Sequence, residues 1–151
     1  MPEFRFDHVA IAVREIEPAL RLYRDVLGGE YLGDGDEGGT YRWAQVRYPG
    51  GGKVELLEPV GDGFLSRFLD SRGEGLHHIT FKTDDIEAAI DLLEAQGFEL
   101  VDVQLDDPRW KEAFLRPSKN HKTLVQVAQP GAPSEDAEDA LHSSNLEELQ
   151  S

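Results

Sequence analysis

The chain repeats one sequence pattern twice, and this repeat constrains its fold more than any other feature. The segment HVAIAVREIEPALRLY, residues 8–23, aligns with HITFKTDDIEAAIDLL, residues 78–93, at an offset of 70 residues. A second pair of segments, KVELLEP at 53–59 and LVQVAQP at 124–130, aligns at an offset of 71 residues. Landmarks that recur at a nearly constant spacing indicate two halves with the same fold.

Each half reads as a strand, a helix and then three more strands, from the period of its apolar residues. In the first half the helix ends at the Gly28–Gly29 pair, and we expect strands at 5–13, 30–33, 40–48 and 53–58. In the second half we expect strands at 76–82, 98–103, 110–116 and 123–129. Its helix, at 85–96, is expected to begin at Asp84 with Glu87 as the capping partner. A short helix at 63–71 joins the two halves.

Length and composition fit one compact domain, since the chain has 151 residues, 39% of them apolar, and no cysteine. We expect this domain at 1–130, with modules at 4–59 and 75–130 and an acidic C-terminal tail at 131–151. No apolar stretch is long enough to span a bilayer, and the first residues lack the features of a secretion signal. We therefore expect a cytoplasmic protein without membrane contact.

The charge of the chain bears on its partners. A net charge of −15 argues against nucleic acid, whose phosphates would be repelled. Residues 109–122 are the exception, because five basic residues and the single acid Glu112 give this segment a local charge of +4. The segment predicts a small anionic ligand, although a hairpin with solvated basic tips explains it equally well. We expect Arg116 and Lys122 from this segment, together with Arg42, to bind substrate.

Strand phase places four polar side chains on the inner face of the predicted sheet. In HVAIAV the bulky residues share the side that packs under a helix, which leaves His8 and the small residues after it on the opposite side. The same alternation puts His78, Glu55 and Gln126 on the inner face. His77 then points the other way, toward a helix or an interface, and is not expected to bind what His78 binds.

These four side chains are all of metal-ligand type, since imidazole nitrogen, carboxylate oxygen and amide oxygen bind divalent ions. Each one alone is more often a hydrogen-bonded structural residue. Two pairs at equivalent positions of a curved sheet, however, converge on one point. We therefore predict one divalent metal ion, and the residue types do not distinguish Co, Ni, Zn, Mn and Mg.

The chain resembles the vicinal-oxygen-chelate superfamily of glyoxalases, bleomycin-resistance proteins and extradiol dioxygenases, over residues 4–129. Within it, DHVAIAV, KVELLEP, FLSRFLDSRGEGLHHITF and FLRPSKNHKTLVQV are most similar to the methylmalonyl-CoA epimerases. The resemblance implies an α+β fold in which two βαβββ modules form one eight-stranded cup with helices on the outside. It also places the ligands of one divalent metal at His8, Glu55, His78 and Gln126.

The resemblance further implies a metal-dependent enzyme that moves a proton beside a carbonyl or thioester, with an acyl-CoA as its small anionic substrate. A homodimer is the expected assembly. Such epimerases generally carry a glutamate where this chain has Gln126, and some add a carboxylate near Arg42. Because an amide cannot exchange a proton in this way, Glu55 is the expected catalytic residue.

Two alternatives stay open. One base suits a glyoxalase I-type isomerase at least as well as an epimerase. An extradiol dioxygenase is disfavoured, because that group usually takes its carboxylate from the last strand, where this chain has Gln126. A metal-free protein of the bleomycin-resistance type, which sequesters a ligand, is the other alternative. The four ligand-type residues count against it.

Overall fold

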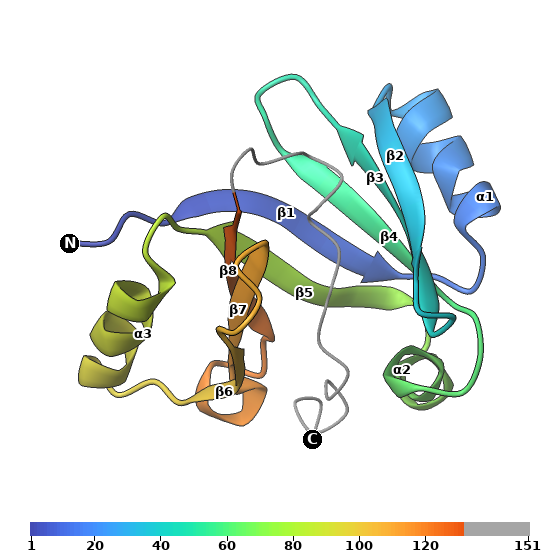
Figure 1. The fold of residues 1–151 in the computed structure, drawn as a ribbon. Coiled ribbons are helices and arrows are strands. Elements are labelled where there is room, and N and C mark those ends of the chain that lie inside the picture. The colour runs from blue at the N-terminus through green and yellow to red at the C-terminus, as the bar shows by residue number, and fades with distance from the viewer. Residues whose placement is uncertain (132–151) are drawn as a thin grey trace.

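The computed structural model describes residues 1–131, and its strands form one mixed sheet (Figure 1). The strands lie in the order β2-β3-β4-β1-β5-β8-β7-β6. Their bounds are β1 (Arg5–Ala12), β2 (Glu30–Glu37), β3 (Tyr41–Arg47), β4 (Lys53–Pro59), β5 (Gly75–Lys82), β6 (Leu100–Gln104), β7 (Trp110–Leu115) and β8 (Val125–Pro130). The expected acidic tail at 131–151 lies outside the described residues apart from Gly131.

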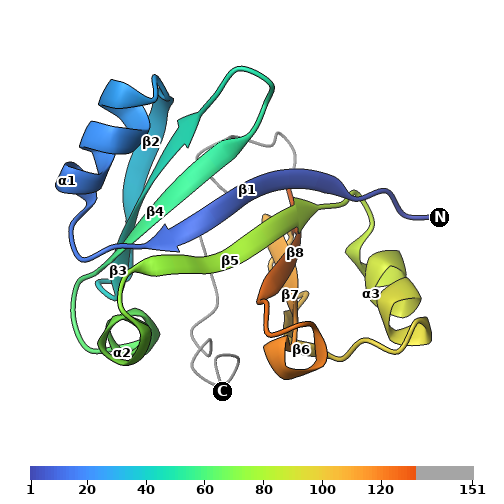
Figure 2. The same cartoon turned by 180° about the vertical axis from the view of Figure 1, so that it is seen from behind.

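The helices flank this sheet. Helix α1 (Ile16–Leu20) continues as a π-helical turn, η1 (Arg21–Val26), and lies beside β2–β4, whereas α3 (Ile86–Ala95) lies at the other end of the molecule (Figure 2). Helix α2 (Phe64–Arg72) joins the halves, and a 3-10 turn, η2 (Pro117–Lys119), precedes β8. None of the described helices is long and apolar enough to cross a membrane.

The two halves are related by a pseudo-twofold axis between β1 and β5. Strand β1 is parallel to β4 and β5 is parallel to β8, while β1 and β5 run antiparallel to each other. Equivalent hydrogen bonds end the first strands: the amide of Val13 donates to Leu57 O and that of Thr83 to Ala128 O, both at 2.9 Å. The predicted α+β fold of two βαβββ modules in one eight-stranded sheet is therefore confirmed.

The two outer helices begin in the same way. The first helical amide of α1, on Ile16, donates to Glu58 Oε1 at 2.8 Å, and that of α3, on Ile86, donates to Gln129 Oε1 at 2.9 Å. Glu58 and Gln129 occupy equivalent positions on the last strand of each half. Each helix is thus fixed to its own half by a side chain that satisfies a terminal N–H group.

Two local predictions were wrong. Asp85, not Asp84, caps α3, because its carboxylate accepts from the amide of Ala88 at 3.1 Å, while Asp84 pairs with Arg5. Strand β2 extends through the expected GDGDEGG turn as far as Glu37. It can do so because Gly35 lies under the indole of Trp43, where a Cβ atom would come within 2.8 Å of the ring.

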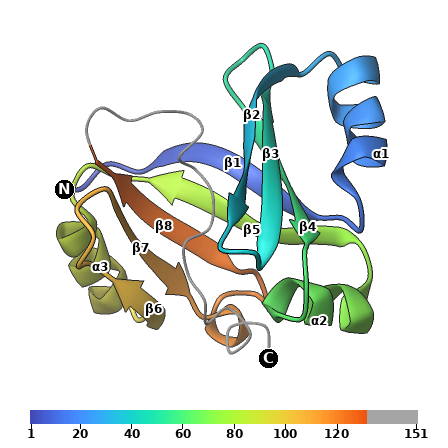
Figure 3. The same ribbon diagram turned by 45° about the vertical axis from the view of Figure 1, so that its right-hand side comes forward.

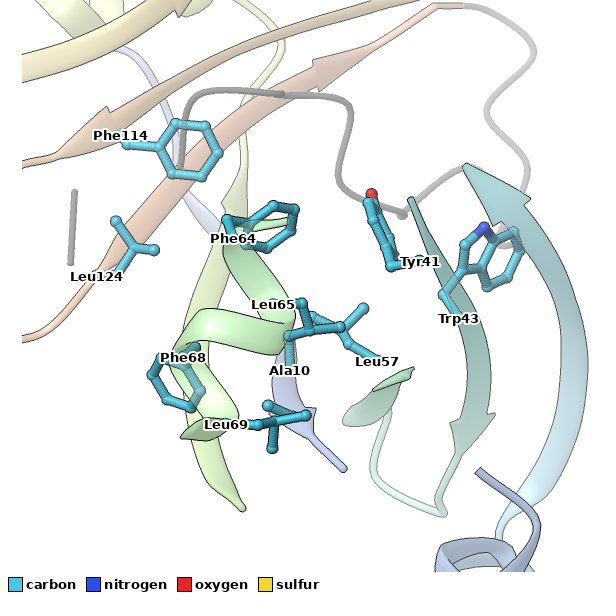
Figure 4. Packing of buried hydrophobic residues seen from close by; sticks show 11 residues of the cluster. Ala10, Tyr41, Trp43, Leu57, Phe64, Leu65, Phe68, Leu69, Phe114 and Leu124 are labelled. Atoms are coloured by element: carbon cyan, nitrogen blue, oxygen red, sulfur yellow. The ribbon is translucent and has the colours of Figure 1, made fainter. Parts of the chain in front are cut away.

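The apolar core has three parts. Outer clusters pack α1 and α3 against their own halves, and an inner cluster fills one end of the cup. The inner cluster consists of Ala10, Ala12, Tyr41, Trp43, Leu57, Phe64, Leu65, Phe68, Leu69, Phe114 and Leu124. Figure 4 shows side chains of α2 lying between Tyr41 of β3 on one side and Phe114 of β7 and Leu124, which directly precedes β8, on the other. Figure 3 shows the two halves of the sheet turned toward each other around this space.

A close approach at Gly29 gives a test of the first half. A Cβ atom there would lie 2.6 Å from the carbonyl oxygen of Tyr23 and 2.9 Å from Cβ of Val46. We expect Gly29→Ala to lower the free energy of unfolding by about 1–3 kcal/mol, because backbone must shift to relieve the overlap. Gly52→Ala is the matched control, since nothing lies within 4 Å of its Cβ position. Equal urea midpoints for the two variants would contradict this packing.

Candidate metal centre

Strand register brings the four predicted ligands into two neighbouring rows. Ala10 of β1 pairs with Glu55 of β4 on one side and with His78 of β5 on the other. In the next inward row, Thr80 of β5 pairs with His8 of β1 and with Gln126 of β8. The pseudo-twofold axis exchanges the rows, because Ala10 and Thr80 are equivalent. Each half therefore supplies one histidine and one candidate oxygen ligand from facing positions.

Three of these side chains lie close enough to hold one ion. One ligand atom from each of His8, Glu55 and His78 falls within 4.8 Å of the other two, and all three residues are buried. Nε2 of His8 is 3.9 Å from Oε1 of Glu55, and the two imidazole rings stand edge to face at 5.8 Å between centroids. Gln45 holds the carboxylate of Glu55 by donating to Oε2 at 2.7 Å.

Both histidines are oriented by the residue before them. The β1–β5 register shifts at Asp7 and at His77, which are equivalent positions, and each shift is a bulge. Nδ1 of His8 donates to Oδ2 of Asp7 at 2.8 Å, and Nδ1 of His77 lies 3.0 Å from Nδ1 of His78. Two lysines, Lys53 at 3.1 Å and Lys82 at 3.4 Å, hold the other oxygen of Asp7. Ligand orientation by such partners is typical of metal sites.

The position of His77 refines the prediction made for it. Its ring packs against Phe64 and Phe68 of α2, at centroid distances of 5.6 and 4.9 Å, so it does face a helix. The bulge nevertheless keeps its Nδ1 in contact with that of His78. Strand alternation alone could not show this contact, since it assumes a regular strand.

The free imidazole nitrogens fit a metal. Nε2 of His8 and Nε2 of His78 are buried, and neither has a hydrogen-bond partner among residues 1–131. Burial lowers the pKa of His8, against the opposing effect of Asp7. Burial also lowers the pKa of His78 well below its usual value, and the nearby rings of His77 and His8 add to this shift. Both rings are therefore neutral near pH 7, which is the form that binds metal.

The fourth position belongs to a buried hydrogen-bonded group. Oε1 of Gln126 accepts from Thr80 at 2.7 Å, and Nε2 of Gln126 donates to Oε1 of Glu112 at 2.9 Å. Trp110 also donates to Oε1 of Glu112, at 2.8 Å. Sequence reasoning missed Glu112 as a residue of this interior. Its signal was present, because Trp110, Glu112 and Phe114 alternate along a predicted strand.

The three predicted substrate-binding residues lie in different parts of the structure. Arg42 lies on the outer side of β3 and pairs with Glu58 at 3.1 Å, away from the four candidate ligands. Strand phase is the reason, because the inward side chain is the next one, Trp43. Arg116 pairs with Glu99 at 2.8 Å.

Lys122 is the residue that lies near the candidate ligands. It lines a cavity of about 160 Å³ together with Arg72, His77 and His78. The cavity therefore combines two basic side chains with the histidine pair of the second half.

Comparisons with known proteins agree with this arrangement. The family model of the Glyoxalase/Bleomycin resistance protein/Dioxygenase superfamily matches residues 7–114. The chain therefore belongs to that superfamily, and the resemblance predicted from its sequence is confirmed.

Individual relatives narrow the comparison to one kind of enzyme within the superfamily. The chain is 34% identical to an ethylmalonyl-CoA/methylmalonyl-CoA epimerase of Cereibacter sphaeroides over 133 residues, which cover 83% of this chain and 97% of that protein. A hypothetical protein from Bacillus halodurans C-125 superposes with a TM-score of 0.78 at 29% identity, covering 88% of this chain and 99% of the other.

A Streptomyces coelicolor methylmalonyl-CoA epimerase in complex with 2-nitronate-propionyl-CoA superposes with a TM-score of 0.71 at 27% identity, covering 85% and 98% of the two chains. The expectation of an enzyme of this superfamily, with epimerases as its relatives, is confirmed.

Buried histidines make the stability of the metal-free protein depend on pH. Burial, followed by the charge of Arg72, lowers the pKa of His77 to about 3, and the pKa values of His8 and His78 are lowered too. Below the unfolded value of about 6.5, the unfolded chain binds more protons than the folded chain. We expect the free energy of unfolding to fall from pH 6.5 to 5, by up to about 1.4 kcal/mol per pH unit for each histidine.

Chemical denaturation at several pH values measures this slope. His77→Gln should reduce it by about one proton, because that variant has one buried imidazole fewer. A stability that stays constant between pH 6.5 and 5 would contradict the neutral, buried histidines.

Proposed function

We propose that this protein is a divalent-metal-dependent epimerase that inverts the α-carbon of a small acyl-CoA, with methylmalonyl-CoA as the first candidate. The observation that carries the proposal is the buried cluster of His8, Glu55 and His78, whose ligand atoms lie within 4.8 Å of one another. Relatives that are epimerases of methylmalonyl-CoA support the choice of substrate. The homodimer remains a prediction, which the mass in solution would test.

His8, Glu55, His78 and Gln126 would hold the metal. The two histidines present neutral imidazoles, and Glu55 and Gln126 add oxygen atoms from the facing rows. Gln126 can accept from Thr80 and still offer a second lone pair, because an amide oxygen has two. Two nitrogens and two oxygens suit borderline divalent ions that keep room for a further oxygen ligand.

The chemistry requires a proton to leave the carbon next to a thioester carbonyl. A bound divalent ion supplies Lewis acidity at the carbonyl oxygen, where negative charge develops. Glu55 is placed to take the proton, since Gln45 fixes one of its oxygens. The apolar walls of the cup exclude water, which strengthens these electrostatic interactions. Glu55 thus combines the roles of ligand and base.

The cavity beside His77 and His78 offers a contact for the anionic part of the substrate. Arg72 and Lys122 both line this cavity, so two cations lie at its wall. Phosphate groups of coenzyme A match such a pair in charge. Arg42, which lies on the outer face, takes no part in this proposal.

Substitution of Glu55 tests the reaction. We expect the purified protein, reconstituted with Co²⁺, to epimerise methylmalonyl-CoA and to exchange its α-hydrogen in heavy water. Glu55→Gln keeps an oxygen ligand of similar size but removes the base, so it should retain metal and epimerise about 10²- to 10⁴-fold more slowly. Nuclear magnetic resonance of the α-hydrogen and elemental analysis measure the two properties. Full activity of Glu55→Gln would contradict the assignment.

The two neighbouring histidines provide a second test. We expect His78→Ala to abolish stoichiometric metal binding, because it removes a ligand. His77→Gln should weaken metal affinity about 10- to 100-fold, because it removes only the partner that orients His78. Titration calorimetry with Co²⁺ measures both, and equal losses in the two variants would show that the ligand assignment is wrong.

The same measurements distinguish the alternative functions. Stoichiometric metal without exchange of the thioester would favour a glyoxalase I-type reaction. Absence of metal at saturating Co²⁺ would favour a ligand-sequestering protein of the bleomycin-resistance type.

A further inference from the structure

We propose that Glu112 is a second catalytic carboxylate of this site, which exchanges a proton with the α-carbon on the face opposite to Glu55. The inference rests on the proposed epimerase function and deepens it, because inversion of a stereocentre needs a proton acceptor on one face and a donor on the other. Glu55 alone can serve only one face. A second group must therefore reach the α-carbon from another wall of the cup.

The position of Glu112 meets this requirement. In the sheet order, β7 lies in the second half and β4 in the first, with β1, β5 and β8 between them. Glu112 pairs with Ala128, which is the next inward-facing residue of β8 after Gln126. Glu112 therefore lies on the inner face, next to the rows that carry the candidate ligands. Its neighbour on that face, Phe114, belongs to the inner cluster and contacts the space between the halves (Figure 4). Glu55 and Glu112 therefore approach the interior from opposite walls.

The negative charges of Glu55 and Glu112 both act on the hydroxyl of Tyr41. The pKa of Tyr41 is raised well above its usual value, first by burial and then by the negative charges of Glu55, Glu37 and Glu112. Tyr41 lies on β3 in the first half and points into the inner cluster (Figure 4). Its hydroxyl is thus within electrostatic range of the carboxylates of both halves.

The hydrogen bonds of Glu112 fix its orientation. Oε1 accepts from Trp110 and from Gln126, at 2.8 and 2.9 Å, and the residue is fully buried. Oε2 takes no part in these two bonds. Both donors are neutral groups, so they position the carboxylate without adding a compensating positive charge. Buried acidic groups cost free energy to desolvate, and they gather at functional sites.

The step balances without an additional reactant. One carboxylate takes the α-hydrogen as a proton, and the electron pair of the broken C–H bond moves toward the thioester oxygen. The other residue, which starts as a carboxylic acid, gives its proton to the opposite face as the carbonyl forms again. The product differs from the substrate only in configuration, and the two carboxyl groups have exchanged protonation states.

The test compares each epimer of methylmalonyl-CoA in heavy water, with Co²⁺-loaded protein. In Glu112→Gln we expect epimerisation to fall about 10²- to 10⁴-fold, with unchanged Co²⁺ stoichiometry and affinity. The epimer whose α-hydrogen faces Glu55 should still exchange it for deuterium, with retention of configuration, while the other epimer should not. Glu55→Gln should show the reverse preference. Glu87→Gln, on the exposed side of α3, is the control and should match the wild type.

A second variant covers a loss of folding in the first. Glu112→Ala leaves a gap in which added formate should restore part of the epimerisation, whereas a purely structural role of Glu112 would not respond to formate. The inference is overturned if Glu112→Gln epimerises at the wild-type rate. It is also overturned if that variant keeps Co²⁺ but exchanges neither epimer, or both equally. A wild-type protein that neither epimerises nor exchanges would overturn the proposed function as well.

Discussion

The antiparallel pairing of β1 with β5 is the interaction on which the rest of the structure depends. It joins the two halves edge to edge, and it is the only contact that places His8 beside Thr80 and Ala10 beside His78 among the described strands. The two bulges in this pairing lie at Asp7 and His77, immediately before the candidate ligands His8 and His78. A change in its register would therefore separate the ligands and their orienting partners together.

The site concentrates polar groups where the surrounding fold is apolar. Burial keeps His8 and His78 neutral, and the side-chain oxygens of Glu55 and Gln126 each accept from an amide or hydroxyl of a neighbouring strand. Such a network is costly to assemble, since each member loses its water. The apolar clusters on either side of the sheet supply the compensating stabilisation. Stability and readiness to bind a ligand are thus set against each other at the same positions.

Much of this arrangement could be predicted from the sequence, because the repeat and strand alternation are both properties of residue order. They placed His8, Glu55 and His78 on one face, and the structure brings these three together. Alternation failed for the His77 contact, since a bulge is a departure from regular pairing. In residues 110–116 the same alternation puts Glu112 on the inner face with Trp110 and Phe114, although the excess of basic residues there predicts an anion-binding surface. Side-chain contacts such as Glu112 with Gln126 depend on distances between strands that no local pattern contains.

The pseudo-twofold axis has a consequence for how such a site can diverge. Each half offers the same set of inward positions, so Glu55 and Gln126 are one equivalent pair. Trp43 and Glu112 are a second pair, because they lie opposite the equivalent residues Leu57 and Ala128. Two coordinated exchanges of residue type would move both carboxylates to the partner half without any change of backbone. The proposed ligand carboxylate would then lie in the second half and the proposed second carboxylate in the first, on an unaltered backbone. Duplicated folds of this kind can therefore exchange which half carries the metal-binding carboxylate, while one carboxylate stays on each wall of the cup.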